Sequence, residues 1–237
     1  ALTPLYLKYD ISGIVCRSTG KALLTTANIA QKFKLPSLSK DIVLIATEKS
    51  ELRNFCNANQ IKTIRGRKVG PEDDIDSIKS KLKLPLIVKP DYTVVGKKDI
   101  TIISKYSDLA GSIKSACKSS ANGLAEIEEY VEGFDVTSLF LLKTGYAKTI
   151  AIVDELVGVQ NSGHVIGLGA SVPSVISNSS VEKKIIQTID LFASNFKNAT
   201  ALLQLCFRID MNGTPHVIEL HADLGGKEFE DIVSSKT

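Results

Sequence analysis

The sequence contains few of the residues that build metal clusters and disulfide frameworks. Its 237 residues include four cysteines and three histidines, and the cysteines lie far apart without a CxxC pair. Neither a zinc framework nor a disulfide scaffold is therefore indicated, and reduced thiols in a cytoplasmic protein fit this composition best. Met211 is the only methionine, so we expect that Ala1 is not the first translated residue and that the chain is processed or partial.

Long apolar runs and a strong charge imbalance are also absent. No stretch approaches the roughly 18 uninterrupted apolar residues of a membrane span, and residues 1–20 lack the charged-then-apolar order of a signal peptide. The net charge of +3, from 29 basic and 26 acidic residues, is too small for the concentrated basic face that nucleic acid requires. A composition of 43% hydrophobic and 23% charged residues excludes disorder, collagen and coiled coil.

Strand-like and helix-like segments alternate along the chain. The pattern predicts helices over residues 21–33, 107–119 and 181–196, one or two helices over 39–59, and a further helix that opens at Pro71. It predicts strands over residues 11–15, 61–64, 85–90, 99–104, 125–131, 202–210 and 214–220, long strands within 135–160, and glycine-containing turns over 161–173. The fold class is therefore α/β leaning to α+β, with breaks near residues 60–70 and 133.

The pair Asn212-Gly213 predicts that the last two strands form a hairpin, because a type I′ turn needs positive φ at both central residues. Counting back from this turn gives the register of the two strands. The register pairs Cys206 with Glu219, Gln204 with His221 and Arg208 with Val217.

Side chains of this hairpin alternate between two faces. The core face carries Leu203, Leu205, Phe207, Ile209, Ile218 and Leu220, and the opposite face carries Gln204, Cys206, Arg208, Glu219 and His221. The polar face is either a binding face or the solvated face of an antiparallel sheet. A nucleophilic pair of Cys206 and His221 is a weaker alternative, since no third group orients it.

Several segments, in order and over nearly the whole chain, resemble the ATP-grasp superfamily. The run LIVKP at 86–90 is similar to the strand whose lysine reaches the nucleotide phosphates, which implies that role for Lys89. The run at 46–63 resembles the segment with an earlier phosphate-binding lysine, here Lys49. The run DYTVVGKK at 91–98 resembles the loop that covers the phosphates, which implies roles for Gly96 and for Lys97 or Lys98.

The run EIEEYVEGFD at 126–135 is the most specific match, and it resembles the hinge between the two lobes. The resemblance implies that Glu128 accepts from the adenine amino group and that Glu129 and Val131 offer backbone contacts to the ring. It also implies that Asp135 binds the ribose hydroxyls, and a carboxylate suits a diol.

The run at 208–226 resembles the closing segment of the superfamily, in which acids on two strands hold magnesium. Glu219 keeps that role, but Cys206 stands in place of an acid and His221 in place of an asparagine. Asp223 replaces a frequent arginine and Asp99 a common glycine. Magnesium prefers oxygen ligands, so Cys206 and His221 beside Glu219 would make a poor site.

The resemblance implies an ATP-grasp fold, with two α+β lobes around a nucleotide cleft. Residues 1–60 would be part of an N-terminal α/β domain, 61–133 the first lobe and 134–237 the second. The implied activity is that of a carboxylate–amine ligase of the kind found in carbamoyl-phosphate synthases. ATP and Mg²⁺ would activate a small-molecule carboxylate as an acylphosphate, which an amine or thiol attacks.

In that reaction Arg208 would be the catalytic residue that binds the substrate carboxylate or the acylphosphate, and the protein would often be a homodimer. The alternative is a degenerate module that binds a nucleotide or small acid without turnover, as the altered metal cluster favours. A third hypothesis is an unrelated α/β binding domain.

Overall fold

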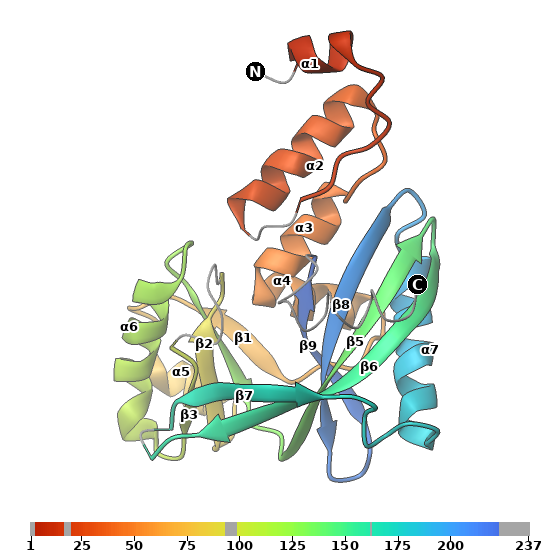
Figure 1. Cartoon of the computed structure of the whole chain (residues 1–237). Coiled ribbons are helices and arrows are strands. Elements are labelled where there is room, and N and C mark those ends of the chain that lie inside the picture. Colours follow the sequence, from red (N-terminus) through yellow and green to blue (C-terminus); the bar gives the residue numbers. More distant parts are fainter. Residues whose placement is uncertain (1–2, 17–19, 93–98, 162, 223–237) are drawn as a thin grey trace.

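A computed structural model describes residues 3–16, 20–92, 99–161 and 163–222 of the chain (Figure 1). Within these ranges the strands form two separate antiparallel sheets, one of four strands and one of five. The chain passes from the first sheet to the second between Glu129 and Gly133, close to the break expected near residue 133. The division into domains stays a prediction.

The four-stranded sheet has the order β1 (Gly66–Val69), β4 (Ala125–Glu129), β2 (Leu86–Pro90) and β3 (Thr101–Ile103). Helices α5 (Ile75–Lys79) and α6 (Leu109–Ser119) lie on one side of it (Figure 1), and the short 3-10 helix η1 (Tyr106–Asp108) leads into α6. Ile78, Ile113, Val88 and Ile127 are among the residues of their common core. The opposite face of this sheet carries apolar residues, among them Ile87 and Ile102, as well as the polar residues Lys89 and Glu128.

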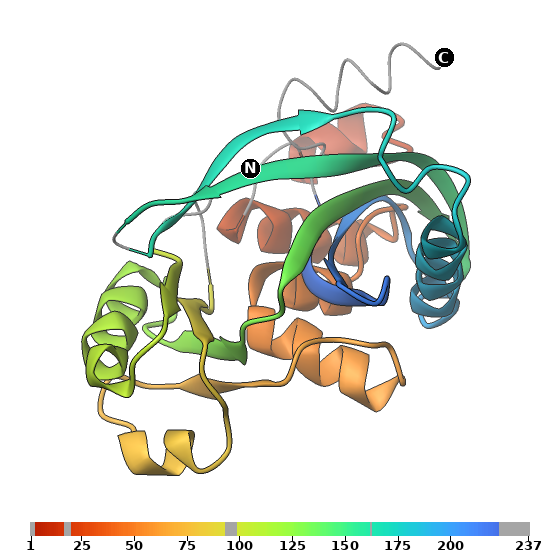
Figure 2. The ribbon, with the colours of Figure 1, turned by 90° about the horizontal axis from the view of Figure 1, so that it is seen from below.

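The five-stranded sheet has the order β7 (Val165–Ser171), β6 (Tyr146–Val159), β5 (Gly133–Lys143), β8 (Thr200–Asp210) and β9 (Pro215–His221). Helix α7 (Ser180–Ser194) packs beside it (Figure 2), and Ile185, Ile189 and Phe192 join its core. The serine at the N-cap of α7, Ser179, accepts from Val181 N and Glu182 N, which explains why the helix begins there.

Four helices precede the sheets: α1 (Thr3–Lys8), α2 (Lys21–Phe33), α3 (Lys40–Thr47) and α4 (Lys49–Ala58). Leu23, Ile42 and Cys56 from these helices are buried in the same cluster as Phe140 and Leu203 of the five-stranded sheet. Helices α2, α3 and α4 therefore share the core of that sheet. This packing places the start of α4 near β9.

Most segments that the sequence predicts are present, but three differ, and the helix expected to open at Pro71 begins instead at Ile75. Residues 11–15 form no strand. This apolar run pairs with no other strand, and Val15 is 85% exposed. Residues 165–171, expected as turns, form β7 despite Gly167 and Gly169, because hydrogen bonds along β6 outweigh their weak strand propensity. The short strand expected over 61–64 is reduced to one bridge, between Thr63 and Val217.

The hairpin of β8 and β9 has the predicted pairs Cys206–Glu219 and Gln204–His221, but Arg208 lies opposite His216 and not Val217. Two offsets cancel. The turn is one residue longer than a type I′ turn, with positive φ only at Gly213, and a bulge follows between Cys206 and Phe207. Relative to the predicted register, the bulge turns Val217 to the core face of the sheet and Ile218 to the opposite face.

Because of this bulge Val217 is buried in the core, and the expected core residue Ile218 lines a cavity on the opposite face. The sequence assignment of Ile218 to the core is therefore wrong. No helix in the described ranges is long and apolar enough to cross a membrane.

Candidate functional site

A cavity of about 230 Å³ lies between the two sheets, and both sheets contribute to its walls. Apolar side chains dominate the walls: Ile87 and Ile102 come from the first sheet, and Val157, Val159 and Val165 from the second. The polar lining residues are Lys89, Glu128, Glu129, Tyr130, Asp135 and Arg208. Apolar walls with a few converging polar groups are typical of small-molecule sites.

The turn between β6 and β7 reaches across to β3 and joins the two sheets at one side of the cavity. Ile102 N donates to Gly163 O at 3.0 Å, and Val165 N donates to Ile100 O at 3.1 Å. Gly163 has a φ of +81°, and a Cβ there would lie 2.7 Å from Ile102 O. The close approach of the two backbones therefore requires glycine at this position.

Lys89 of β2 lies in the cavity wall and pairs with Glu128 of β4. Its Nζ donates to Glu128 Oε2 at 2.7 Å, and the two residues are only 6% and 4% exposed. Burial alone would lower the pKa of Lys89, but Glu128, with smaller contributions from Glu219 and Glu126, outweighs it and leaves the pKa raised. Lys89 is therefore a buried cation.

Lys49, the first residue of α4, meets Glu219 of β9 at 3.0 Å between Nζ and Oε1. His221 Nε2 lies 3.7 Å from the other carboxylate oxygen, Oε2. Burial would raise the pKa of Glu219, but the charges of Lys49, His221 and Lys89 hold it well below its usual range. Lys49 and Lys89, from segments far apart in the sequence, thus act on one carboxylate.

Glu126, two residues before Glu128, is a second buried acid on the same face of β4. It is 0% exposed, and Arg53 of α4 donates to its Oε1, while Oε2 has no partner. Burial raises the pKa of Glu126 to about 7, with the Arg53 hydrogen bond opposing. The sequence analysis missed this pair, although acids at alternate positions of a buried strand were a usable signal.

At the hinge end of the cavity, Arg208 contacts three neighbours at once. Its Nε donates to Val131 O at 2.9 Å, its Nη1 to Asp135 Oδ1 at 2.9 Å and its Nη2 to Tyr130 Oη at 3.0 Å. The guanidinium carbon also lies 5.3 Å from the centre of the Tyr130 ring. Arg208 therefore contacts the hinge, and its expected contact with substrate stays a prediction.

Two further hinge residues, Glu128 and Glu129, already have partners in the protein. Glu128 binds Lys89, and Glu129 Oε1 accepts from Lys83 N at 3.0 Å. Glu129 also lines the cavity together with Val131 and Asp135, as the resemblance implies. Their contacts to a nucleotide stay predictions.

Cys206 lies opposite Glu219 in the register, but its thiol contacts the neighbouring strands. Its Sγ is 3.1 Å from Thr137 Oγ1 and 3.8 Å from Glu155 Oε1, and Thr137 also donates to Glu155. Throughout the part of the chain that the structure describes, no three His, Cys, Asp or Glu side chains are grouped as metal ligands. Glu219, Cys206 and His221 therefore do not fit a magnesium ion as they stand. Glu155 is another residue that the sequence analysis missed.

Four residues singled out from the sequence lie outside the described residues: Gly96, Lys97, Lys98 and Asp223. Apart from Cys206 and His221, the remaining predicted site residues form two groups. Lys49, Lys89, Glu128 and Glu219 form a charged group, of which Lys89 and Glu128 line the cavity, and Glu129, Val131, Asp135 and Arg208 line its hinge end.

No family model matches the sequence. Solved structures do match the fold, among them an L-amino acid ligase from Bacillus licheniformis, at a TM-score of 0.70 and 17% identity over 95% of this chain. The biotin carboxylase domain of the Hydrogenobacter thermophilus 2-oxoglutarate carboxylase, solved with MgADP, ADP and bicarbonate, matches at a TM-score of 0.73 and 15% identity, again over 95% of this chain. Phosphoribosylamine–glycine ligase from Thermotoga maritima matches at a TM-score of 0.69 and 20% identity over 89% of this chain.

This chain spans about half the length of these proteins. It covers 52% of the L-amino acid ligase, 51% of the biotin carboxylase domain and 56% of the phosphoribosylamine–glycine ligase. At such low identity the likeness shows the fold alone. The two-sheet architecture agrees with it. The chain has the ATP-grasp fold.

Proposed function

We propose that the protein is an ATP-dependent ligase, which activates a small carboxylate as an acylphosphate for attack by an amine or thiol. The observation that carries the proposal is that the charges of Lys49 and Lys89 both act on Glu219, while Lys89 itself lies in the wall of an apolar cavity. Two cations beside an apolar slot match the chemistry of ATP, which joins a flat base to a polyphosphate.

The base would occupy the apolar part of the cavity, between Ile87 and Ile102 on one side and Val157 and Val159 on the other. Asp135, which Arg208 now binds, would turn to the ribose hydroxyls. Lys49 and Lys89 would exchange their carboxylate partners for phosphate oxygens. Because the lysines are already charged and oriented, they need little reorganisation to neutralise the polyphosphate.

In the proposed reaction a carboxylate oxygen of the substrate attacks the γ-phosphorus of ATP, and ADP leaves. The nitrogen of the amine then attacks the acyl carbon of the acylphosphate, phosphate leaves, and the amine loses a proton. Lys49 and Lys89 would stabilise the charge that develops on the phosphoryl oxygens. Because the described side chains do not fit magnesium, we assign no step to a metal ion.

A second function, binding of nucleotide without turnover, is favoured by Cys206. A thiol that contacts Thr137 and Glu155 replaces the oxygen donor expected opposite Glu219. The two functions share the nucleotide site and differ only in chemistry. Self-association and a cytoplasmic location are further proposals that follow from the resemblance.

ADP release separates the two functions. We expect ADP to form from ATP only when a suitable carboxylate is present, and hydroxylamine to trap the acylphosphate as a hydroxamate. Amino acids, dipeptides and bicarbonate are the first carboxylates to try, because the matched proteins include amino acid ligases and a biotin carboxylase domain. If ATP binds but neither ADP nor hydroxamate forms with each of these carboxylates, the result would contradict the ligase and favour the binding module.

Lys89→Ala in the same assay tests the site, with Lys79→Ala as its control. Lys79 lies on α5 and pairs with the exposed Asp76. We expect the first variant to lose ADP release and the second to keep it. Equal activity in the two variants would place the reaction elsewhere.

A further inference from the structure

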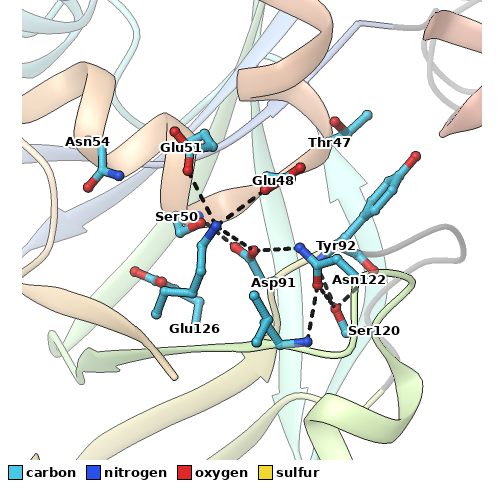
Figure 3. Close-up of polar contacts among 12 residues, drawn as sticks. Thr47, Glu48, Ser50, Glu51, Asn54, Asp91, Tyr92, Ser120, Asn122 and Glu126 are labelled. Atoms are coloured by element: carbon cyan, nitrogen blue, oxygen red, sulfur yellow. Dashed lines mark hydrogen bonds and ion pairs between the residues drawn. The ribbon is translucent and has the colours of Figure 1, made fainter. Parts of the chain in front are cut away.

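Asp91 follows β2 directly, two residues after Lys89, and it is 0% exposed. Its Oδ1 accepts from Ser50 N at 2.8 Å, and its Oδ2 accepts from Asn122 Nδ2 at 2.8 Å, with Lys68 Nζ at 3.5 Å from Oδ2. Figure 3 shows Asp91 between Ser50 and Asn122. We call Ser50, Lys68, Asp91 and Asn122 the Asp91 hub.

The hub caps helix α4 from a distant part of the chain. Glu48, the N-cap residue of α4, makes no side-chain capping hydrogen bond. Lys49 N donates instead to Asp91 O at 3.0 Å, beside the bond from Ser50 N to Asp91 Oδ1. The first amides of a helix lack acceptors within the helix and carry its positive end, so a carboxylate there is favourable. Asp91 thereby fastens the start of α4 to the end of β2.

The surroundings require a carboxylate at position 91. Asn122 Oδ1 accepts from Ser120 Oγ at 2.7 Å and from Leu124 N at 3.2 Å, which directs Asn122 Nδ2 toward Asp91. Both oxygens of Asp91 therefore face donors, one from Ser50 and one from Asn122. An asparagine at position 91 would turn its own NH₂ group toward one of those donors, because an amide has a single acceptor oxygen.

Lys68 balances the buried charge of the hub and links it to the first turn of α4. Its Nζ lies 3.3 Å from Glu48 Oε2 and 3.3 Å from Glu51 Oε1, as well as near Asp91. Burial would lower the pKa of Lys68, but Asp91, Glu51 and Glu48 leave it raised. The carboxylate of Asp91 is thus paired with a cation, so its burial is compensated.

The hub fixes the relative position of the two lysines that converge on Glu219. Lys49 is the first residue of α4, and Lys89 is the second-last residue of β2. We propose that Asp91 is a positioning residue for polyphosphate: it holds the Lys49 backbone at a set distance from Lys89, so that both ammonium groups reach one triphosphate. This inference rests on the proposed nucleotide site and adds to it a residue that touches no ligand.

Comparison of two ligands in the Asp91→Asn variant tests this inference. Adenosine and ATP share the base and ribose, and only ATP needs both lysines. Calorimetric titration should show the affinity for ATP falling about tenfold, the size of one lost charge-assisted contact, while the affinity for adenosine changes less than about twofold. Asp76→Asn, at an aspartate 84% exposed on α5, is the matched control and should change neither affinity.

Asn122→Ala is the second variant. It keeps the carboxylate of Asp91 and removes the donor to Oδ2, together with the acceptor of Ser120 Oγ and Leu124 N, and it carries the test if Asp91→Asn does not fold. The ratio of ATP to adenosine affinity should fall in this variant too. A folded variant with an unchanged ratio, or with equal losses for both ligands, would overturn the positioning role. A wild-type protein that binds neither ligand would overturn the proposed function and this inference with it.

Discussion

Protonation of Glu126 should make folding depend on pH between 4.5 and about 7. Burial raises the pKa of its carboxyl from 4.5 to about 7, so between these values the folded state holds a proton that the unfolded state has released. The stability contributed by Glu126 is therefore greatest below pH 4.5 and is lost as the pH rises to about 7. Around this carboxyl stand Arg53 of α4, Lys89 of β2 and Glu128 of β4.

Glu126→Gln removes this titration and keeps the shape of the side chain. We expect the free energy of unfolding of the variant, relative to the wild type, to increase as the pH rises from 4.5 to about 7 and then to stay level. Urea unfolding of both proteins across this range measures the difference. A difference that is constant with pH would contradict the raised pKa.

Cys206 determines at residue scale whether the site can hold magnesium. In Cys206→Glu a third carboxylate would join Glu155 and Glu219 on the same face of the sheet. Because like charges repel, we expect the melting temperature to fall without metal, and magnesium with ATP to raise it more than in the wild type. Calorimetry of ATP with and without magnesium checks the second effect. Cys117→Ser, at a cysteine of α6, is a control.

An unchanged dependence on magnesium in folded Cys206→Glu would show that residues 206 and 219 do not form a metal site. A gain in magnesium dependence that Cys117→Ser does not share would support one. Any accompanying rise in ADP release would further distinguish the ligase from the binding module.

At the scale of elements, the turn between β8 and β9 gives a direct test of the hairpin. Only Gly213 has a positive φ there, at +70°, whereas a type I′ turn would require it at Asn212 as well. Gly213→Ala should therefore cost about 1 kcal/mol of stability, and Asn212→Ala clearly less. Chemical denaturation of the two variants measures both values. Equal costs would indicate a type I′ turn instead.

The same hairpin shows how far sequence reasoning reaches. Alternation and the Asn-Gly signal predicted both strands, because apolar residues at every second position have to face the core. Two of the three named pairs agree because the longer turn and the bulge shift the register in opposite directions. The bulge that carries Ile218 from the core into the cavity depends on packing against other elements. No local signal in β9 shows it, which explains the wrong assignment of Ile218.

Contacts between residues far apart in the chain could also not be predicted from the sequence. Spacing predicted α2 and α4 well, but it could not show that Arg53 of α4 meets Glu126 of β4, or that Asp91 caps α4. These contacts join residues 73 and 41 positions apart, and they are set by how α4 packs against the sheets. The resemblance brought out Lys49 and Lys89 separately, and only the fold brings them to one carboxylate.

At the scale of the whole molecule, α4 connects the two sheets that enclose the cavity. Lys49 binds Glu219 of the five-stranded sheet, and Arg53 binds Glu126 of the four-stranded sheet. A ligand that neutralises Lys49 and Lys89 would therefore interact with both sheets. Binding only to the folded state stabilises a protein by about 2.7 kcal/mol when the ligand is at a hundredfold excess over its Kd.

The most direct test of the nucleotide site is calorimetric titration of ATP into the wild type, Lys89→Ala and Lys79→Ala. The wild type and Lys79→Ala should bind ATP with the same Kd, since Lys79 lies on the surface of α5. Lys89→Ala should bind at least about tenfold more weakly, because it loses a buried cation and leaves Glu128 unpaired at the charged side of the cavity. Equal affinity of all three proteins, or no binding by the wild type, would contradict a nucleotide site between the two sheets.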